Sequence, residues 1–425
     1  MVKLNLHWQI LIALGLGTVA GLMVGPETSG TVPPVLVKMF GFLGAIFLRA
    51  LKMIIVPLIA SSIITGVAGV SSSDSIGRIS FKTMTYYVVT SLIAIITGLV
   101  FVNLVAPGLV DGMPAKDILG LEGDPAALGA GIAGRSAGSL IDIVFRMIPD
   151  NPIRAAADGD ILPIIVFCLL FGYVSAKIGG KSGQFLADLW QAIFDVMMKL
   201  THLVMRLAPI GVFGLIAKTV ASTGFHAFRP LLWYAFTVFC ALATHFLVTL
   251  PVLLKLAGKV KPARHYRAMA PALLTAFSTS SSSATLPLTM DCVENGAGVS
   301  NKISSFVLPL GATVNMDGTA LYECVAAMFI AQAYGVHLDA GQQFIVVVTA
   351  LLASIGAAGI PSAGLVMLAV VLNAVGLPLE GAGIVLAVDR ILDMSRTAVN
   401  VFSDSCGAVI IARSEGETTL LDDAH

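Results

Sequence analysis

Residues 387–412 read AVDRILDMSRTAVNVFSDSCGAVIIA, and this stretch decides how the rest of the chain is interpreted. Five polar residues recur within it: Asp389, Asp393, Arg396, Asn400 and Asp404. At about 100° per residue they share one helix face about 80° wide. An ionised side chain at the centre of a bilayer costs roughly 2.5–3.5 kcal/mol, even on permissive insertion scales. The stripe therefore predicts a helix whose polar face lines a protein interior or a wet pocket.

The composition excludes an ordinary water-soluble enzyme. Of 425 residues, 57% are hydrophobic and only 12% are charged, whereas soluble domains carry about 25% charged residues. Basic and acidic residues are equal in number, so the basic excess that a nucleic-acid partner needs is absent. The cysteines and histidines lack metal-ligand spacing, and there is no nucleotide-binding P-loop. What remains is a polytopic membrane protein, either a channel or a gradient-driven transporter.

Six apolar segments are long enough to cross a bilayer, which takes about 20 residues. They are residues 8–25, 39–69, 83–107, 161–179, 186–220 and 230–256. Basic residues concentrate in alternate loops, which predicts a multi-pass protein of the cell (inner or plasma) membrane with both termini cytoplasmic. The first segment lacks a signal-peptide cleavage site, so we expect a retained helix. The Gly- and Ala-rich stretch 108–160 then lies on the outer side.

Two later apolar segments are interrupted. Residues 278–283 are six consecutive hydroxyl residues, which disfavour a helix interior. Residues 344–378 contain no charge and as one helix would measure about 52 Å, against a hydrocarbon core of about 30 Å. Gly359-Ile360-Pro361 divides this segment into two short arms, which predicts a re-entrant hairpin.

Each interrupted segment precedes a helix with buried polar groups, around residues 315–319 and 389–404. This order is typical of an inverted-repeat transporter with its site near the bilayer midplane. The alternative is a solvated serine loop and a single kinked helix. It does not explain why both breaks precede acidic helices.

The buried acids outnumber the buried bases. The net charge is −2 before Glu323 is included, from Asp317, Asp389, Asp393 and Asp404 against Arg390 and Arg396. A ladder of salt bridges explains only part of this set, because buried charge of one sign needs a counter-ion. Carboxylates, together with carbonyls freed at a glycine-containing turn, predict sites for small cations.

Arg396 and Asp393 lie almost one helical turn apart. A guanidinium presents a planar fork that suits a carboxylate, and an aspartate can bind an ammonium group. Arginine for one end and aspartate for the other describe a zwitterion with an additional acid group. The pair predicts an acidic amino acid as the small-molecule partner.

Four motifs carry a family resemblance: TSSSSATLP (279–287), GATVNMDGTALYE (311–323), ASIGAAGIPSAG (353–364) and DRILDMSRTAVN (389–400). They resemble the glutamate/aspartate:cation symporter family, which includes archaeal aspartate transporters and animal excitatory amino-acid transporters. The resemblance is strong from about residue 161 onward. It implies an all-α polytopic membrane protein with eight transmembrane helices and two re-entrant helical hairpins in inverted repeats. It also implies a homotrimer and an elevator-type movement.

The resemblance also implies a division of the chain. Residues 1–255 form an N-terminal six-helix part, with scaffold helices and some transport-domain helices, including 83–107 and 230–256. Residues 256–425 form the C-terminal transport core. Within it we expect hairpin 1 at about 260–295, helix 7 at about 302–333, hairpin 2 at about 340–375 and helix 8 at about 379–413.

The site residues implied by the resemblance fall into a substrate set and a sodium set, with Na+ as the co-transported ion. For the substrate, Arg396 binds the side-chain carboxylate and Asp393 the amino group, completed by Thr397, Asn400, Thr319, Ser282 and the backbone of Ser280, Ile360 and Gly364. One sodium is expected near Gly311, Asn315, Asn400 and Asp404. A second uses carbonyls of Thr313, Ser354, Ile355 and Ala357. A third uses Tyr87, Thr90, Ser91, Asn315 and Asp317.

Three positions vary between branches of the family. Ser280 stands where archaeal members have arginine, and Met394 where animal carriers have arginine. Arg390, one turn before Met394, is a candidate to replace that charge. Glu323 follows the animal pattern, in which a glutamate at this position is tied to proton or potassium coupling.

We therefore expect a sodium-coupled symporter of L-glutamate and L-aspartate, and not an enzyme. A carrier of C4-dicarboxylates or of neutral amino acids is the alternative within the same class, although Asp393 argues against the first and Arg396 against the second. An ion channel is the alternative from another class. An intramembrane hydrolase is disfavoured, because the serine run lacks a G-x-S-x-G motif.

Overall fold

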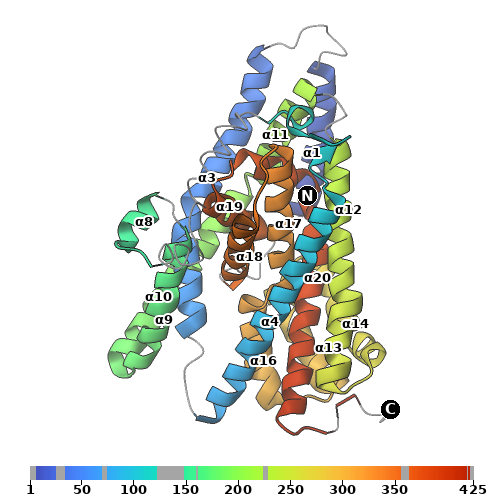
Figure 1. The fold of residues 1–425 in the computed structure, drawn as a ribbon. Helices are drawn as coiled ribbons and strands as arrows, with labels where there is room; N and C mark the ends of the chain where they lie inside the picture. The colour runs from blue at the N-terminus through green and yellow to red at the C-terminus, as the bar shows by residue number, and fades with distance from the viewer. Residues whose placement is uncertain are drawn as a thin grey trace, which may run out of the picture.

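The computed structural model describes residues 6–24, 34–68, 74–121, 148–158, 161–223, 228–355, 363–418 and 420–421. These residues form an elongated, almost entirely helical bundle (Figure 1). The first part of the chain contains α1 (Leu6–Val24), α3 (Pro34–Ala68), α4 (Asp74–Val105), α5 (Lys116–Leu119), α8 (Pro152–Asp158), α9 (Ile161–Ile178), α10 (Gly180–Met205) and α11 (Ala208–Thr223).

The second part begins with one long helix, whose regular portions α12 (Phe228–Thr244) and α13 (Leu250–Leu253) alternate with the π-helical turns η2 (His245–Thr249) and η3 (Leu254–Gly258). The remaining elements are α14 (Pro262–Thr279), α15 (Ser282–Asp291), η4 (Cys292–Gly296), α16 (Asn301–Val314), α17 (Asp317–Ala333), α18 (Ala340–Ile355), α19 (Ala363–Val375) and α20 (Glu380–Ser414).

The expected single span over 186–220 is wrong. The structure divides it between α10 and α11 at Arg206 and Leu207. Pro209 lies in the first turn of α11, where its missing N–H and fixed φ are tolerated, whereas in a helix interior it would break the hydrogen-bond ladder. The break therefore lies just before the proline.

A small hairpin departs from the all-helical prediction. The two-residue strands β1 (Leu109–Val110) and β2 (Met113–Pro114) pair antiparallel after α4. Asp111 and Gly112 join them with positive φ angles of 52° and 80°. An Asp-Gly pair is a preferred connection for such a tight turn. Residues 122–147, which form much of the predicted outer stretch, lie outside the described residues.

Helix α11 packs between α1 and α3 through close glycine contacts. A β-carbon at Gly211 would lie 2.4 Å from the β-carbon of Phe47, and one at Gly214 would lie 2.6 Å from the Phe40 carbonyl oxygen. Small residues let helix backbones approach closely, which is the usual basis of helix packing in membranes. α9 and α10 also pack against α3.

The second packing unit of the bundle is centred on α17 and α20. These helices pack with α4, α12 and α16, and α14 packs along α20. Every residue of α17 except Gln332 is buried. A helix that is enclosed on all sides can carry polar groups only if they find partners inside the protein. The polar groups of α17 and of the adjoining face of α20 are therefore the candidates for a functional site.

The predicted interruption at the serine run and the predicted glycine-containing turn are both breaks between helices. The serine run divides α14 from α15 at Ser280 and Ser281, and Ser280 has a φ of 53°, in the left-handed region. The turn before Gly318 divides α16 from α17 at Asn315 and Met316, which are not helical. The predicted break at 359–361 lies outside the described residues, between α18 and α19.

Two described helices are long and apolar enough to cross a bilayer by themselves, over Arg78–Val105 and Phe228–Gly258. Several shorter apolar helices, such as Pro163–Ile178 and Ala340–Ile355, accompany them. Helix α20 has 35 residues and so extends about 52 Å, well beyond a hydrocarbon core of about 30 Å.

The segment after α20, residues 415–421, ties three distant parts of the chain together. Glu415 accepts hydrogen bonds from Arg78 and Lys82 on α4. Arg264 donates to the Leu421 carbonyl at 2.9 Å, and the Leu421 N–H donates to Ala297 at 3.1 Å. We call residues 415–421 the C-terminal clasp. It joins the start of α4 to both ends of the α14–α15 pair.

The two basic partners lower the pKa of the Glu415 carboxyl to about 2. A depressed carboxyl pKa stabilises the fold above the ordinary value of about 4.3, and this stabilisation is lost as the pH falls toward 2. Glu415→Gln should therefore lower stability by up to about 1 kcal/mol at neutral pH, and less in high salt. The measurement is the apparent melting temperature of the purified protein in detergent, with exposed Asp150→Asn as the control. A Glu415→Gln deficit that did not shrink between pH 5 and pH 3 would contradict this assignment.

Candidate functional site

The predicted polar face of α20 is buried. Near the N-terminal end of this face, four charged residues form a cluster. Asp389, Arg390, Asp393 and Arg396 make up this arginine–aspartate cluster. Arg396 is fully buried, and its Nη2 donates to Asp393 Oδ1 at 2.7 Å. Its Nη1 lies 3.1 Å from Asp389 Oδ1. Arg390 reaches Asp393 Oδ2 at 3.4 Å.

Neighbouring helices hold the Arg396 guanidinium from two further directions. Its Cζ atom lies 3.7 Å from the ring centroid of Tyr322 on α17, a cation–π contact. Gly364, in the first turn of α19, leaves room for it, because a β-carbon there would lie 3.0 Å from Nη1. Thr397 donates its hydroxyl to the Asp393 carbonyl at 2.8 Å. The guanidinium is therefore fixed by its ion pairs with Asp389 and Asp393, by the Tyr322 ring and by the nearby backbone of Gly364.

A second polar cluster lies one to two turns further along α20, where the α16–α17 break meets this helix. Asn315, Asp317, Asn400, Ser403 and Asp404 make up this asparagine–aspartate cluster. The Asn315 amide donates to Asp404 Oδ1 at 2.9 Å and to Ser403 at 3.0 Å. Asn400 accepts from the Gly318 N–H at 2.8 Å and donates to Thr319 at 3.2 Å. The break thus directs an amide and a backbone donor at α20.

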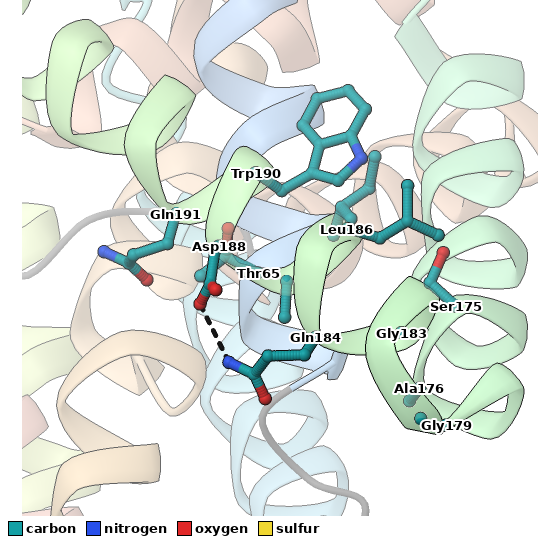
Figure 2. Close-up of a pocket in the computed structure, with 13 residues that line it drawn as sticks. Thr65, Ser175, Ala176, Gly179, Gly183, Gln184, Leu186, Asp188, Trp190 and Gln191 are labelled. Atoms are coloured by element: carbon teal, nitrogen blue, oxygen red, sulfur yellow. Dashed lines mark hydrogen bonds between the residues drawn. The ribbon is translucent and has the colours of Figure 1, made fainter.

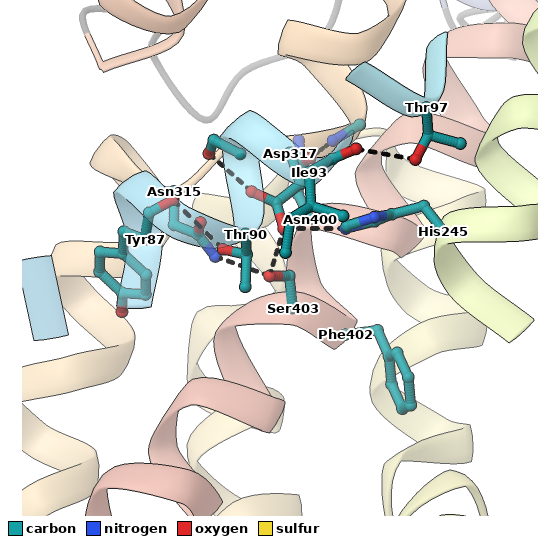
Figure 3. Close-up of polar contacts among 12 residues, drawn as sticks. Tyr87, Thr90, Ile93, Thr97, His245, Asn315, Asp317, Asn400, Phe402 and Ser403 are labelled. Atoms are coloured by element: carbon teal, nitrogen blue, oxygen red, sulfur yellow. Dashed lines mark hydrogen bonds and ion pairs between the residues drawn. The ribbon is translucent and has the colours of Figure 1, made fainter. Parts of the chain in front are cut away.

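Three helices converge on the carboxylate of Asp317 (Figure 3). Ser91 of α4 donates to Oδ1 at 2.6 Å, and Ser403 of α20 donates to Oδ2 at 2.6 Å. His245 Nε2 lies 3.1 Å from the same Oδ2, and its ring is fully buried at the first π-helical turn. Asp317 is therefore held in place by hydrogen bonds, without a lysine or arginine among its partners in the described part of the chain.

The two clusters differ in charge. The arginine–aspartate cluster has two acids and two bases, so it is neutral. The net −2 of the sequence count thus lies with Asp317 and Asp404, both buried. The Asn315 side-chain oxygen is also buried, and it has no hydrogen-bond partner among the described residues. Surplus acid and an unused amide oxygen are the ligand types that bind small cations.

Several other predicted residues lie beside these clusters. A β-carbon at Gly311 would be 2.5 Å from Asp404 Oδ1 and 2.6 Å from the Tyr87 hydroxyl, so glycine permits this approach. Tyr87 donates to the Val307 carbonyl at 2.7 Å, and Thr90 donates to carbonyls of its own helix. Within the predicted third sodium set, Ser91 donates to Asp317 across two helices, while Thr90 and Tyr87 share a local bond within α4.

The remaining predicted residues come from the helix pairs α14–α15 and α18–α19. Ser280 is buried, and its hydroxyl has no partner in the described chain, while Ser282 is buried at the start of α15. Thr313 donates to Leu310 and Ser354 to Leu351, and both bonds are local. Ile355 ends α18 and packs on the core that includes Val314. Ala357 and Ile360 lie outside the described residues.

Glu323 is the least satisfied acid of the interior. It lies on α17 and is fully buried, and neither carboxyl oxygen has a hydrogen-bond partner among the described residues. An ionised carboxylate without a donor or counter-ion is very costly in an apolar interior, so such a group is neutral unless a cation joins it. Its position is consistent with a role in binding a proton or cation.

Sequence reasoning missed three residues. Ser403 lies on the same face of α20 as the polar stripe, so its position was available from the helical period. His245 is an ionisable residue within an apolar segment, which is itself a signal of function in a membrane helix. Tyr322 contacts Arg396 only through the packing of α17 on α20, for which the sequence carries no local signal.

Two cavities lie away from both clusters. One of about 420 Å³ lies between α3 and the α9–α10 turn, where Gln184 donates to Asp188 at 2.9 Å (Figure 2). Another, of about 380 Å³, lies between α3, α11 and the start of α20. Neither includes Thr397, and residues 356–362, which precede Gly364 and α19, are outside the described chain. A wet pocket along the polar face of α20 stays a prediction.

A helical bundle with paired and surplus charges buried between interrupted helices is the architecture of a membrane transporter. Comparison with known proteins agrees with this class. The profile of the sodium:dicarboxylate symporter family matches residues 6–414, so the chain belongs to that family. It is accordingly a multi-pass membrane protein and a transporter, and not an enzyme.

Similar proteins include an excitatory amino acid transporter 3 of Mus musculus, 38% identical over 96% of this chain and 85% of the relative. The proton/glutamate-aspartate symporter of Escherichia coli is 37% identical over 97% of this chain and 94% of the relative. The proton/sodium-glutamate symport protein of Geobacillus stearothermophilus is 34% identical over 98% of this chain and 96% of the relative.

Gly364→Ala should destabilise the arginine–aspartate cluster. The new methyl group would press on a guanidinium that Asp389, Asp393 and Tyr322 already fix, and overpacking typically costs about 1–3 kcal/mol. We expect a lower apparent melting temperature in detergent. Gly15→Ala is the matched control, because nothing lies within 4 Å of the corresponding β-carbon. Equal melting temperatures for the two variants would show that α19 yields without cost.

Proposed function

We propose that this protein is a secondary active symporter that uses a sodium gradient to move L-glutamate and L-aspartate across the cell membrane. The observation that carries this proposal is the buried pair of Arg396 and Asp393, 2.7 Å apart. One member matches a carboxylate and the other an ammonium group. The names of the relatives, which are glutamate and aspartate carriers, support the same substrate class.

In this proposal the substrate exchanges partners with the protein. Arg396 turns from Asp393 to the side-chain carboxylate of the substrate, and the Asp393 carboxylate receives the amino group. Thr397, Asn400 and Thr319 complete the site, together with Ser282 and the backbone of Ser280, Ile360 and Gly364. The Asn400–Thr319 hydrogen bond and the close approach of Gly364 to the guanidinium support this set. The unpartnered Ser280 hydroxyl is a donor available to a carboxylate.

Sodium binds where acid is in surplus. The first site consists of Gly311, Asn315, Asn400 and Asp404, and the third of Tyr87, Thr90, Ser91, Asn315 and Asp317. The second uses carbonyls of Thr313, Ser354, Ile355 and Ala357. The charge of −2 on Asp317 and Asp404 supports the first and third sites, because alkali cations offset buried carboxylates. Contact between α16 and α18 supports the second.

Glu323 is the candidate for coupling to protons or potassium. Its buried, unpartnered carboxyl oxygens favour a bound proton or a cation over a bare charge. Two of the bacterial relatives have proton coupling in their names. We infer that Glu323 carries a proton during part of the transport cycle.

The packing of the helices supports a division of the chain into a scaffold and a transport unit. α1, α3, α9, α10 and α11 form the scaffold, and α4, α12 and residues 256–425 form the transport unit, which moves as an elevator within a homotrimer. In this arrangement α14–α15 and α18–α19 are the two re-entrant hairpins among eight transmembrane helices. Both termini are cytoplasmic. The basic partners of the C-terminal clasp support this orientation, because basic residues concentrate on that side.

A C4-dicarboxylate carrier is the second candidate. The contact of Arg390 with Asp393 favours it, because an aspartate already neutralised by an arginine has less need of an ammonium group. Neutral amino acids and a simple ion channel have no such observation in their favour.

Transport is tested with the purified protein in lipid vesicles. Labelled L-aspartate should accumulate under an inward sodium gradient and not when choline replaces sodium. Arg396→Cys should reduce aspartate uptake more than about tenfold, because a hydrogen bond to a charged group contributes about 1.5–3 kcal/mol. Arg396→Lys keeps the charge without the planar fork and should be intermediate. Uptake without sodium would refute the coupling, and unchanged aspartate affinity in Arg396→Cys would remove this arginine from the site.

Asp404→Asn should separate sodium binding from substrate binding. The amide keeps the shape of the side chain but removes one buried negative charge, so the sodium concentration for half-maximal uptake should rise about tenfold or more. Aspartate affinity should recover at saturating sodium. Asp188→Asn, in the α10 cavity, is the control. An unaltered sodium dependence would show that Asp404 does not contact the ion.

A further inference from the structure

Asp393 has two arginine partners, one on each carboxylate oxygen. Arg396 Nη2 takes Oδ1 at 2.7 Å, and Arg390 Nη1 lies 3.4 Å from Oδ2. The Arg390 side chain is only 10% exposed, and its Nε is buried without a hydrogen-bond partner in the described chain. A second guanidinium is therefore held in low-dielectric surroundings beside a residue of the proposed site.

Arg390 makes the arginine–aspartate cluster neutral. Without it, Asp389, Asp393 and Arg396 carry a net charge of −1, and an incoming carboxylate meets an excess of like charge. With it, the net charge is zero. Because a unit charge acts strongly over several ångströms in a buried site, this difference reaches the substrate whether or not Arg390 contacts it.

The two arginines also bind different oxygens of the Asp393 carboxylate. When Arg396 turns to a substrate carboxylate, it leaves Oδ1 of Asp393, while Arg390 stays on Oδ2. Arg390 then keeps the aspartate in position. Its positive charge opposes the nearby ammonium group and attracts the carboxylates.

We propose that Arg390 is a specificity-determining residue, which favours substrates in proportion to their net negative charge. This inference rests on the proposed function, because it concerns the same binding site. It predicts an order of dependence on Arg390, in which succinate (−2) depends most, L-aspartate (−1) less, and L-serine (0) least.

The test measures binding of these three compounds to purified protein in detergent with saturating sodium, by ligand-induced thermal stabilisation. Arg390→Met should weaken binding about tenfold for each unit of negative charge on the ligand and leave serine unchanged or improved. Arg390→Gln is the second neutral variant if Arg390→Met does not fold. Arg390→Lys should stay within about threefold of the wild type. Arg229→Met, which breaks an exposed pair with Asp111, should alter none of the three affinities.

Each outcome of this experiment supports or overturns the inference about Arg390. If Arg390→Met or Arg390→Gln weakens all three ligands equally, or none, Arg390 does not select by charge and the inference is wrong. If both only lower the melting temperature without ligand, Arg390 is a structural residue and the inference is again wrong. A wild-type protein that binds succinate and no amino acid overturns the proposed function. The inference then stands if Arg390→Met weakens succinate binding about a hundredfold, and it is wrong if succinate binding is unchanged. A wild-type protein that binds neither acid overturns both.

Discussion

The ion pair of Arg396 and Asp393 joins two groups that each cost several kcal/mol to remove from water. Such a pair is tolerated in the interior only when neighbouring groups compensate for its lost hydration. The surrounding helices supply several contacts, while Arg396 Nε stays without a hydrogen-bond partner among the described residues. Tyr322 lies under the guanidinium, Gly364 lies against it, and Arg390 and Asp389 complete the neutral set. The Arg396 guanidinium on α20 thus contacts both α17 and α19, and its position constrains how these two helices pack on α20.

Two helix interruptions bring the rest of the polar groups to α20. At Asn315 and Met316 the chain leaves the helix for two residues, so that the amide of Asn315 and the N–H of Gly318 both bond side chains of α20. At Ser280 the left-handed turn starts a new helix, α15, and the turn residues Ser280 and Ser281 are buried together with Ser282. A continuous helix would occupy these backbone groups with its own ladder. The interruptions are therefore what make a charged interior chemically possible.

The sequence predicted the polar face of α20, the serine break and the Asn315 break, because helical period, hydroxyl content and buried charge are local properties. It also predicted the excess of acid over base. It did not locate that excess, since only the packing shows that Arg390 and Arg396 neutralise Asp389 and Asp393 and leave Asp317 and Asp404. The contacts of His245 and Tyr322 depend on distant helices, so no window of sequence contains them. The break before Pro209 was predictable from proline chemistry and was overlooked in a long apolar run.

The order of the chain has a consequence for how this protein is made. Asp317 is inserted with α17, but its partner Ser403 belongs to α20 and is synthesised 86 residues later. Until then the carboxylate can use only Ser91 and His245, from helices already synthesised. Ser91 and His245 are therefore the two side-chain partners of Asp317 that precede it in the chain, and they are available to it before α20 is synthesised.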